Sequence, residues 1–457
     1  MTSDQLAIPT TPASPPRAIA RRSVVSWVLY DLANTVFSMN ICSLYFSLYV
    51  RDVVGPERAD GVFARTTALS MGLIFLLSPL LGAMTDRAPR RVPFLVVSTL
   101  ICIVFTALLG RGGLTFSLAC FVIANVAYQA GLQFYDALLP EVSTEENRGW
   151  IGGIGVGVGY IGSYLGVGVG LYLLHVRAAP KTAVFLATAA LFLLFALPAF
   201  FWIREQGNPR AARFRPAMVS EALRGVRDTL QNAHRYPGLL RFLVGRVFYT
   251  DAINTVITVM GLYVTNLAVR AGRGAEAGER TAQTIMLAAI TFAIAGGFAW
   301  GWVTDRIGPK RTLSVVLWAW VALFLAAATI GLAGLPLAVF YVVASLMGFC
   351  LGGVWAADRP YMLRLSPPER IGEFYGLYGM VGRFSAVSGP LLWSVVVDTL
   401  CGGRPELGQP MGVLSLMVLV LIGLVVLRRV TDEPRQWSGG QPRAFRRGGD
   451  FSGGASS

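Results

Sequence analysis

Long apolar stretches alternate with short polar ones along most of the chain. Each apolar stretch has about 18 residues or more, which is the length a helix needs to cross the hydrocarbon core of a bilayer. The twelve segments cover residues 24–50, 62–84, 92–110, 114–138, 150–174, 182–203, 242–267, 283–303, 312–332, 335–357, 373–398 and 411–428. The pattern predicts an all-α polytopic membrane protein with twelve transmembrane helices.

The polar stretches divide the chain into five parts. We expect an N-terminal tail at 1–23, a six-helix bundle at 24–203, a linker at 204–241, a second six-helix bundle at 242–428 and a basic, disordered tail at 429–457. In the linker, the arginines at 210, 213, 215, 224 and 227 have the spacing of an amphipathic helix lying on a membrane surface.

The second half repeats the first at an offset of about 220 residues, an internal periodicity typical of duplicated bundles. GAMTDR, from Gly82 to Arg87, returns as GWVTDR, from Gly301 to Arg306. The other pairs are Asp31 with Asp251, Asn34 with Asn254, Asp136 with Asp358 and Arg148 with Arg370. This repetition predicts two pseudo-symmetric bundles in the same order and orientation.

Composition and charge support a membrane protein. Only 14% of residues are charged, against about 25% in soluble domains, and the mean hydropathy is +0.58. The net charge of +14 comes from basic residues gathered in alternate loops, which is a topology signal and not a nucleic-acid surface. With the N-terminus inside, 27 Lys and Arg fall on cytoplasmic segments and 10 outside, so we expect both termini in the cytoplasm.

The motifs of enzymes and cofactor sites are missing from the sequence. No G-x-x-x-x-G-K-[ST], H-E-x-x-H or G-x-S-x-G occurs, and the G-x-G-x-x-G at 157–162 follows no strand and lacks the later acid that a dinucleotide site needs. The five cysteines form no CxxC pair, so we expect them to be small core residues. We predict no catalytic residues, no cofactor and no metal.

Several motifs resemble those of the major facilitator superfamily, whose loop between helices 2 and 3 carries a glycine, an acid and a basic cluster, as GAMTDRAPRR does at 82–91. The motifs WVLYDLANTVF (27–37), FYDALLPEV (134–142), GRVFYTDAINTVIT (245–258) and GGVWAADRPYMLRLSPPERIGEFYGLYGMVGR (352–383) resemble the vacuole-effluxer-like branch, which includes fungal autophagy-linked amino-acid exporters. The resemblance covers residues 24–430 and implies a twelve-helix secondary transporter for small polar solutes such as amino acids.

Polar residues at mid-membrane depth are candidates for a central substrate or ion cavity, because a charge there needs a partner or a wet cavity. They are Tyr30, Asp31, Asn34, Tyr249, Asp251, Asn254 and Arg383. The alternative for the Asp and Asn pairs is a structural lock between the bundles. The alternative for Arg383, a candidate partner for a substrate carboxylate, is an ion pair with Asp31 or Asp251. We expect Arg246 to extend to the membrane surface instead.

Charged loops between helices are candidates for a cytoplasmic gate, in which an acid meets a helix N-terminus and basic residues lock one conformation. These residues are Asp86, Arg87, Arg90, Arg91, Asp305, Arg306, Lys310 and Arg311, and the resemblance supports this role. Simple positive-inside topology accounts for the arginines but not for the repeated Gly-x-x-Thr-Asp-Arg. A second set at the cytoplasmic end fits either a gate or a solvated loop; it consists of Asp136, Glu141, Arg148, Asp358, Arg359 and Arg370.

We therefore predict a secondary transporter of the inner membrane that moves a small polar solute, an amino acid or a similar compound, out of the cell by alternating access. Its partners would be a small solute, protons as a candidate co-substrate, and the lipid bilayer, and we expect a monomer. One alternative is a proton-coupled exporter of drugs or lipophiles, with Trp300, Trp355, Tyr361 and Tyr375 lining an apolar cavity. The other is a non-transporting sensor or scaffold that binds partners through the linker or the tail.

Overall fold

The fold is known from a computed structural model that describes residues 19–208, 217–231, 236, 238–272, 274–402, 404–432, 436–438 and 441–443. Most of the predicted N-terminal tail, Arg210, Arg213 and Arg215 of the linker, and the predicted disorder from residue 444 onward lie outside these described residues.

The first half of the chain is helical throughout. It consists of α1 (Arg21–Phe37), the π-helix η1 (Ser38–Leu44), α2 (Tyr45–Val54), α3 (Pro56–Arg87), α4 (Val92–Ala107), α5 (Gly113–Ala137), α6 (Leu139–Val142), α7 (Arg148–Leu171), the π-helix η2 (Tyr172–Val176) and α8 (Lys181–Trp202). In the linker, α9 (Ala217–Gln231) is an amphipathic helix at part of the predicted position.

The second half has the same order of long helices. It consists of α10 (Leu239–Arg270), α11 (Ala275–Ile307), α12 (Pro309–Ala333), α13 (Leu337–Leu365), the 3₁₀ turn η4 (Pro368–Arg370), α14 (Ile371–Ser394), the π-helix η5 (Val395–Leu400) and α15 (Pro405–Arg428). Two short antiparallel strands follow, β1 (Gln436–Ser438) and β2 (Gln441–Arg443).

The all-α membrane fold predicted from the apolar segments is confirmed. Within the described residues, ten helices are long and apolar enough to cross a membrane. α4 is a shorter apolar helix, and the first predicted segment is the helical run α1–η1–α2 from Arg21 to Val54. Each of the twelve predicted segments is therefore helical over most of its length.

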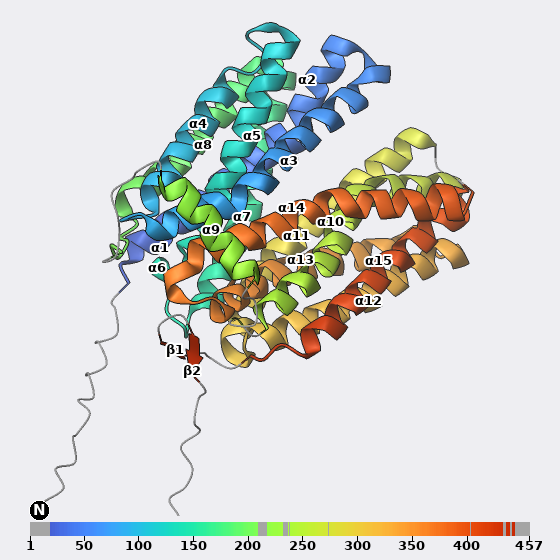
Figure 1. The fold of residues 1–457 in the computed structure, drawn as a ribbon. Helices are drawn as coiled ribbons and strands as arrows, with labels where there is room; N and C mark the ends of the chain where they lie inside the picture. Colours follow the sequence, from blue (N-terminus) through green and yellow to red (C-terminus); the bar gives the residue numbers. More distant parts are fainter. Residues whose placement is uncertain are drawn as a thin grey trace, which may run out of the picture.

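The helices form two bundles that converge toward one end of the molecule (Figure 1). In the first bundle α1 packs on α7 and α8, and in the second α10 packs on α14 and α15. The bundles meet where α3 contacts α14 and where α7 contacts α11 and α13. We call the end that carries Asp86 and Asp305 the closed end and the end that carries α2 the open end. By its basic loops, the closed end is predicted to be cytoplasmic.

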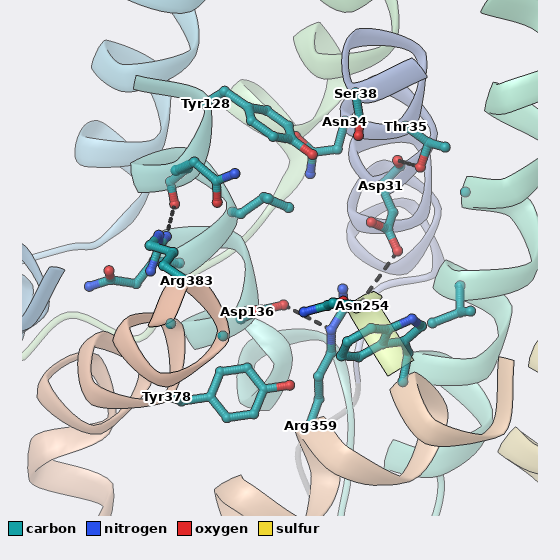
Figure 2. Close-up of a pocket in the computed structure, with 18 of the residues that line it drawn as sticks. Asp31, Asn34, Thr35, Ser38, Tyr128, Asp136, Asn254, Arg359, Tyr378 and Arg383 are labelled. Carbon is teal, nitrogen blue, oxygen red and sulfur yellow. Dashed lines mark hydrogen bonds and ion pairs between the residues drawn. The ribbon is translucent and has the colours of Figure 1, made fainter. Parts of the chain in front are cut away.

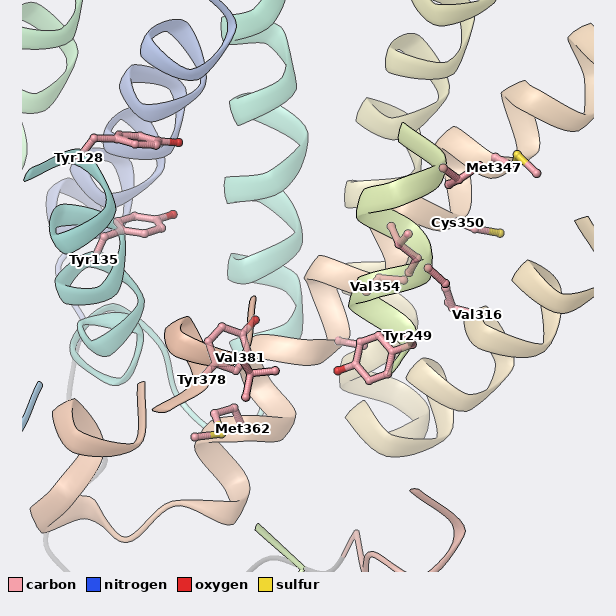
Figure 3. Close-up of a cluster of buried hydrophobic side chains, with 14 of the residues drawn as sticks. Tyr128, Tyr135, Tyr249, Val316, Met347, Cys350, Val354, Met362, Tyr378 and Val381 are labelled. Atoms are coloured by element: carbon pink, nitrogen blue, oxygen red, sulfur yellow. The ribbon is translucent and has the colours of Figure 1, made fainter. Parts of the chain in front are cut away.

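Aromatic side chains fill the interior of each bundle, where they exclude water from the helix contacts. In the first bundle, Trp27 stacks on Tyr135 with ring centroids 4.4 Å apart and donates a hydrogen bond to its carbonyl. In the second, Trp320 lies 5.2 Å from the ring of Phe324. Figure 3 shows members of both interiors, among them Tyr135 on α5 and Met347 on α13. The five cysteines are free, and three of them are buried.

Glycines allow the bundles to approach closely between α7 and α11. A Cβ at Gly153 would overlap the carbonyl of Gly297 and lie 2.6 Å from the Cα of Gly301. Gly168, further along α7, has open space where its Cβ would be. Gly153 therefore has a packing role that Gly168 lacks, because small residues let helix backbones meet within a membrane.

We expect Gly153→Val to separate the bundles at the closed end, because the added side chain cannot fit against the α11 backbone. The measurement is the distance between spin labels on the exposed residues Glu146 and Ile307, in a protein whose five native cysteines are replaced. Gly153→Val should lengthen this distance, and the matched control Gly168→Val should leave it unchanged. An unchanged distance in both variants would contradict this role of Gly153.

Candidate transport cavity and gate

A cavity of about 650 Å³ lies between the two bundles (Figure 2). Its walls come from α1, η1, α3, α5 and α7 of the first bundle and from α10, α13 and α14 of the second. Most of the polar groups that line it are on residues Asp31, Asn34, Thr35, Ser38, Tyr128, Gln129, Gln133, Asp136, Arg246, Asn254, Arg359, Tyr378 and Arg383. A cavity of this size with few, convergent charges fits a small polar solute.

Asn34 is a cavity residue whose side-chain amide has no protein partner within the described part of the chain. Its amide nitrogen and oxygen are both buried, and neither has a hydrogen-bond partner among the described residues. Buried polar atoms without partners are costly, so such a group is well suited to bind a solute or water. Asp31, three residues earlier on α1, lines the same cavity.

Arg359 of α13 connects the bundles at the base of the cavity. Its Nε lies 3.1 Å from a carboxylate oxygen of Asp136 on α5, and its Nη1 lies 3.5 Å from Asp31 on α1. One guanidinium thus serves two carboxylates of the opposite bundle. Asp136 and Asp358 are buried and the Arg359 side chain is only 13% exposed, so these three residues do not lie in a solvated loop, and their role as a gate stays a prediction.

Arg246 of α10 does not extend to the membrane surface, so that expectation was wrong. Its Nε lies 2.9 Å from Asp358, its Nη1 donates to the carbonyl of Tyr378, and its guanidinium lies 3.5 Å from the Tyr378 ring centroid. Asp358 also accepts hydrogen bonds from the hydroxyls of Tyr249 and Tyr378. A buried carboxylate with these partners holds the guanidinium inside the bundle, because a lone charge there would be costly.

Arg383 of α14 lines the cavity and reaches across to the first bundle. Its guanidinium donates to the Ser78 hydroxyl on α3 and to the Gln129 carbonyl on α5, each at 2.8 Å. None of the ion pairs among the described residues includes Arg383, so the alternative of a pair with Asp31 or Asp251 is not observed. Its Nε is buried without a partner.

Residues that correspond in the two halves of the sequence repeat have different surroundings in the structure. Asn254 lines the cavity, but Asp251 does not: it accepts a hydrogen bond from Ser388 at 2.9 Å between α10 and α14. Tyr30 hydrogen-bonds Thr99 inside the first bundle, and Tyr249 binds Asp358. The structure therefore brings Asp31, Asn34, Asn254 and Arg383 to the cavity and leaves the other three candidates in the surrounding packing.

Asp86 and Asp305 hold the closed end together in matching ways. Asp86, at the end of α3, accepts hydrogen bonds from the backbone N–H groups of Gly372 and Glu373 at the start of α14, both at 2.7 Å. Asp305, at the end of α11, accepts from Gly149 and Trp150 at the start of α7, at 2.6 and 2.8 Å. A carboxylate is stabilised at a helix N-terminus by free N–H groups and the helix dipole.

The basic gate candidates have different surroundings. Arg91 forms an ion pair with Asp86 at 3.0 Å, and Arg87 donates to the Glu221 carbonyl on α9. Lys310 donates to the Val430 carbonyl after α15, and Arg306 packs on the Trp302 ring. Arg90 and Arg311 are exposed. Of these residues, Arg91 therefore contacts Asp86 directly, whereas Arg87 connects α3 to α9.

The segments that leave the two bundles also match. Glu205, after α8, accepts from the N–H groups of Arg91 and Val92 where α4 begins, and burial raises the pKa of its carboxyl. Asp432, after α15, accepts from the backbone of Lys310 at the start of α12 and pairs with Arg364 at 3.0 Å. Burial raises the pKa of the Asp432 carboxyl too. In each half, an acidic residue just after the last long helix thus caps the start of the third one, α4 in the first half and α12 in the second.

Several cavity residues were not singled out from the sequence. Tyr128, Tyr160 and Gln133 line the cavity, as do Trp355 and Tyr375 of the aromatic set, whereas Trp300 and Tyr361 do not. Single aromatic or amide residues on long helices carry no sequence signal for the direction they face. No group of three or more His, Cys, Asp or Glu suited to a metal ion occurs among the described residues.

Comparison with known proteins agrees with this geometry. A Bacillus subtilis protein described as an uncharacterized MFS-type transporter, YxiO, is 25% identical over 426 residues, which cover 89% of this chain and 94% of that protein. Autophagy-related protein 22 of Gibberella zeae is 28% identical over 280 residues, which cover 56% of this chain and 41% of that protein.

Two solved structures share the fold. The human organic anion transporter MFSD10 has a TM-score of 0.65 at 17% identity, covering 91% of this chain and all of that chain. A bacterial homologue of the iron transporter ferroportin, in an outward-facing state, has a TM-score of 0.68 at 15% identity, covering 90% of this chain and 99% of that chain. At these identities the likeness shows the fold alone.

The family match extends over most of the chain. Residues 54–435 match the model of the family described as "Vacuole effluxer Atg22 like". With the helical bundles and the relatives above, this match shows that the chain belongs to the Atg22-like branch of the major facilitator superfamily, a family of membrane transporters and not of enzymes.

Proposed function

We propose that this transporter exports a small solute that carries a carboxylate, an amino acid or a similar compound, across the inner membrane by alternating access. The observation that carries the proposal is Arg383, a buried guanidinium that lines the cavity without a carboxylate partner among the described residues. A solute carboxylate would supply the missing countercharge and accept two parallel hydrogen bonds.

The opposite side of the cavity suits the rest of such a solute. Asp31 offers a carboxylate to an ammonium group, and Asn34 offers an amide with both polar atoms free of described protein partners. Figure 2 shows Asp31 and Arg383 facing the cavity from different bundles, so one solute would contact both. The human neighbour MFSD10 is described as an organic anion transporter, which agrees with an anion-binding group here.

The matching caps support alternating access. Asp86 and Asp305 join the bundles at the closed end, while the ribbons diverge toward α2 (Figure 1). Breaking both caps would let the bundles rock about the cavity and open the other side. With the closed end in the cytoplasm, this arrangement corresponds to an outward-open state, with both termini inside.

Counterflow in proteoliposomes tests the proposed function. Vesicles are loaded with unlabelled amino acids, labelled amino acids are added outside one at a time, and no gradient is imposed. We expect saturable accumulation of at least one label. Arg383→Gln should reduce the apparent affinity about 10-fold to 150-fold, because a charge-assisted hydrogen-bonded pair contributes about 1.5–3 kcal/mol.

Two further variants make this result specific. Arg383→Lys keeps the charge but not the planar fork, so we expect a loss of affinity between those of the wild type and of Arg383→Gln. Arg111→Gln changes an exposed arginine between α4 and α5 and should exchange like the wild type. Equal affinity in all three variants would show that Arg383 does not bind the solute, and no exchange of any amino acid by folded protein would remove amino acids as the substrate class.

The gate predicts a second set of variants. Each carboxylate stabilises the closed end by about 1–2 kcal/mol through its interaction with a helix N-terminus. Asp86→Asn and Asp305→Asn each remove the negative charge from one of these two interactions. We expect each variant to increase the population with a long Glu146–Ile307 spin-label distance about 5-fold to 30-fold, and the double variant to increase it further.

The control for the gate is Asp60→Asn, at an exposed carboxylate near the open-end start of α3. It should leave the distance distribution unchanged. If Asp305→Asn behaved like this control while Asp86→Asn opened the gate, the two caps would not be equivalent and closure would depend on the α3–α14 contact alone.

An apolar side pocket favours a second candidate, the export of lipophilic solutes. It has a volume of about 120 Å³, is lined by Met260, Met347 and Trp320 among others, and shares Tyr160 and Ile257 with the central cavity. Methionine-rich surfaces adapt to varied apolar ligands. An apolar group of a solute in the cavity would therefore find a place here.

Filling the side pocket separates the two candidates. We expect Met347→Trp to reduce the efflux of a lipophilic dye about 10-fold if the protein exports lipophiles, because the indole would occupy the space. Val315→Trp, at an exposed position on α12, is the control. Absence of dye efflux from vesicles containing wild-type protein would dismiss this candidate.

A further inference from the structure

One pair of repeated residues lines the cavity from both bundles. Asn34 of α1 and Asn254 of α10 correspond in the repeat, and both are lining residues. Figure 2 shows them extending from their two helices toward the cavity. The repeated acids differ from them, because in each acid pair only the member in the first bundle, Asp31 or Asp136, lines the cavity. The two asparagines can therefore contact one bound solute from opposite sides.

The side-chain amide of Asn34 is buried without hydrogen bonds. Asn34 is 2% exposed, and its amide nitrogen and amide oxygen both lack a partner within the part of the chain that the structure describes. A buried donor or acceptor without a partner raises the free energy of the folded state. Because Asn34 lies in the cavity wall, a rotation about its side-chain bonds would bring the amide to a solute, which then supplies both missing hydrogen bonds.

The asparagines lie at a different level of the cavity from their aspartates. Each asparagine follows its aspartate by three residues, which places it about 4.5 Å nearer the open end at a helical rise of 1.5 Å per residue. Beside Asn34, Ser38 and Tyr128 contribute hydroxyl groups and no charge (Figure 2). An amino acid whose carboxylate and ammonium groups bind Arg383 and Asp31 would extend its side chain to this uncharged level.

Two facing amides select among the side chains that a solute can carry. A carboxamide has N–H donors and a carbonyl acceptor, so it pairs with the Asn34 amide through two hydrogen bonds and keeps a donor and an acceptor for Asn254. A carboxylate only accepts hydrogen bonds, an ammonium group only donates them, and an alkyl group does neither. Each of these three groups would leave polar atoms of the asparagines unpaired, which weakens binding.

We propose that Asn34 and Asn254 bind a side-chain carboxamide of the solute, so that the transported class is the amide amino acids, with glutamine and asparagine as its simplest members. The proposal rests on the proposed function, because the carboxamide belongs to the amino acid whose carboxylate binds Arg383. A site built to hydrogen-bond a ligand rejects analogues without the matching groups more strongly than an apolar pocket rejects one methylene group. The two asparagines therefore determine specificity, while Arg383 and Asp31 bind the groups that all amino acids share.

Counterflow tests the site with three solutes of similar length, glutamine, glutamate and norleucine. In the wild type, the half-saturation concentration of glutamine should be at least about 10-fold lower than those of glutamate and norleucine. Asn34→Leu should raise the value for glutamine about 10-fold to 100-fold and leave the value for norleucine unchanged. Asn254→Leu should act in the same direction. In both variants we expect the preference for glutamine over norleucine to be lost.

Two comparisons make this result specific to the side chain of the solute. Asn266→Leu is the matched control, because it removes an amide from the same helix as Asn254 at a position that does not line the cavity. It should keep the wild-type preference for glutamine. Arg383→Gln should weaken the binding of glutamine and norleucine by the same factor, since both carry the carboxylate that Arg383 binds in the proposed function.

The outcomes separate the carboxamide site from the proposed function. Equal half-saturation concentrations of glutamine and norleucine in the wild type would overturn the carboxamide site and leave the export of amino acids standing. If no amino acid exchanges, the proposed function fails, and propanamide, a carboxamide without a carboxylate, tests the site alone. It should raise the Tm of the purified wild type and not that of Asn34→Leu, because a ligand that binds the folded state stabilises it. No shift of the wild-type Tm would overturn the site.

Thermal unfolding without a ligand distinguishes a binding role of Asn34 from a structural lock between the bundles. Because the Asn34 amide has no partner to lose among the described residues, its replacement by the apolar Leu side chain of similar shape should leave the Tm unchanged or raise it. A structural lock predicts a lower Tm for Asn34→Leu and an equal loss of affinity for glutamine and norleucine. That combination would overturn the proposal.

Discussion

A charge inside an apolar bundle has to meet an opposite charge or a set of hydrogen-bond donors, and this requirement explains how the two halves of the protein fit together. Arg359 of the second bundle finds its carboxylates on the first, and Arg383 finds a hydroxyl and a carbonyl there. The bundles therefore meet through groups that also line the cavity. A charged solute in the cavity would therefore change the free energy of the contact between the bundles. A transporter that couples binding to movement requires such a link.

The closed end uses a different interaction, in which a carboxylate meets the first turn of a helix. It occurs twice, at Asp86 and Asp305, so the two halves have matching gates around a cavity that is not symmetric. Asp31 faces Arg359, whereas its repeat partner Asp251 binds Ser388 within its own bundle. The two halves are therefore alike in the helix caps of the closed end and differ in the acidic groups that line the cavity.

The fold and the helix-end position of Asp86 and Asp305 were accessible from the sequence, whereas the cavity was only partly so. The length of the apolar segments predicts the helices, and the repeated Gly-x-x-Thr-Asp-Arg predicts where the acids of the gate lie. The direction in which a polar side chain points from a helix that is buried on several sides has no such sequence signal. The repeat gives Asp31 and Asp251 equivalent positions, although only Asp31 lines the cavity. The position of Arg246 near a helix end predicted a side chain at the membrane surface, although it is buried. These positions depend on which partner lies across the helix contact. Asp358, the partner of Arg246, is 112 residues away along the chain.

The last residues of the second bundle have a practical consequence. Asp432 caps the start of α12 and pairs with Arg364, as Glu205 caps the start of α4. The chain just beyond α15 is thus part of the folded second bundle and not a spacer. A truncation or a fusion partner placed directly after Arg428 would leave the first turn of α12 uncapped, whereas a tag attached beyond Arg443 would keep every contact of this segment described here.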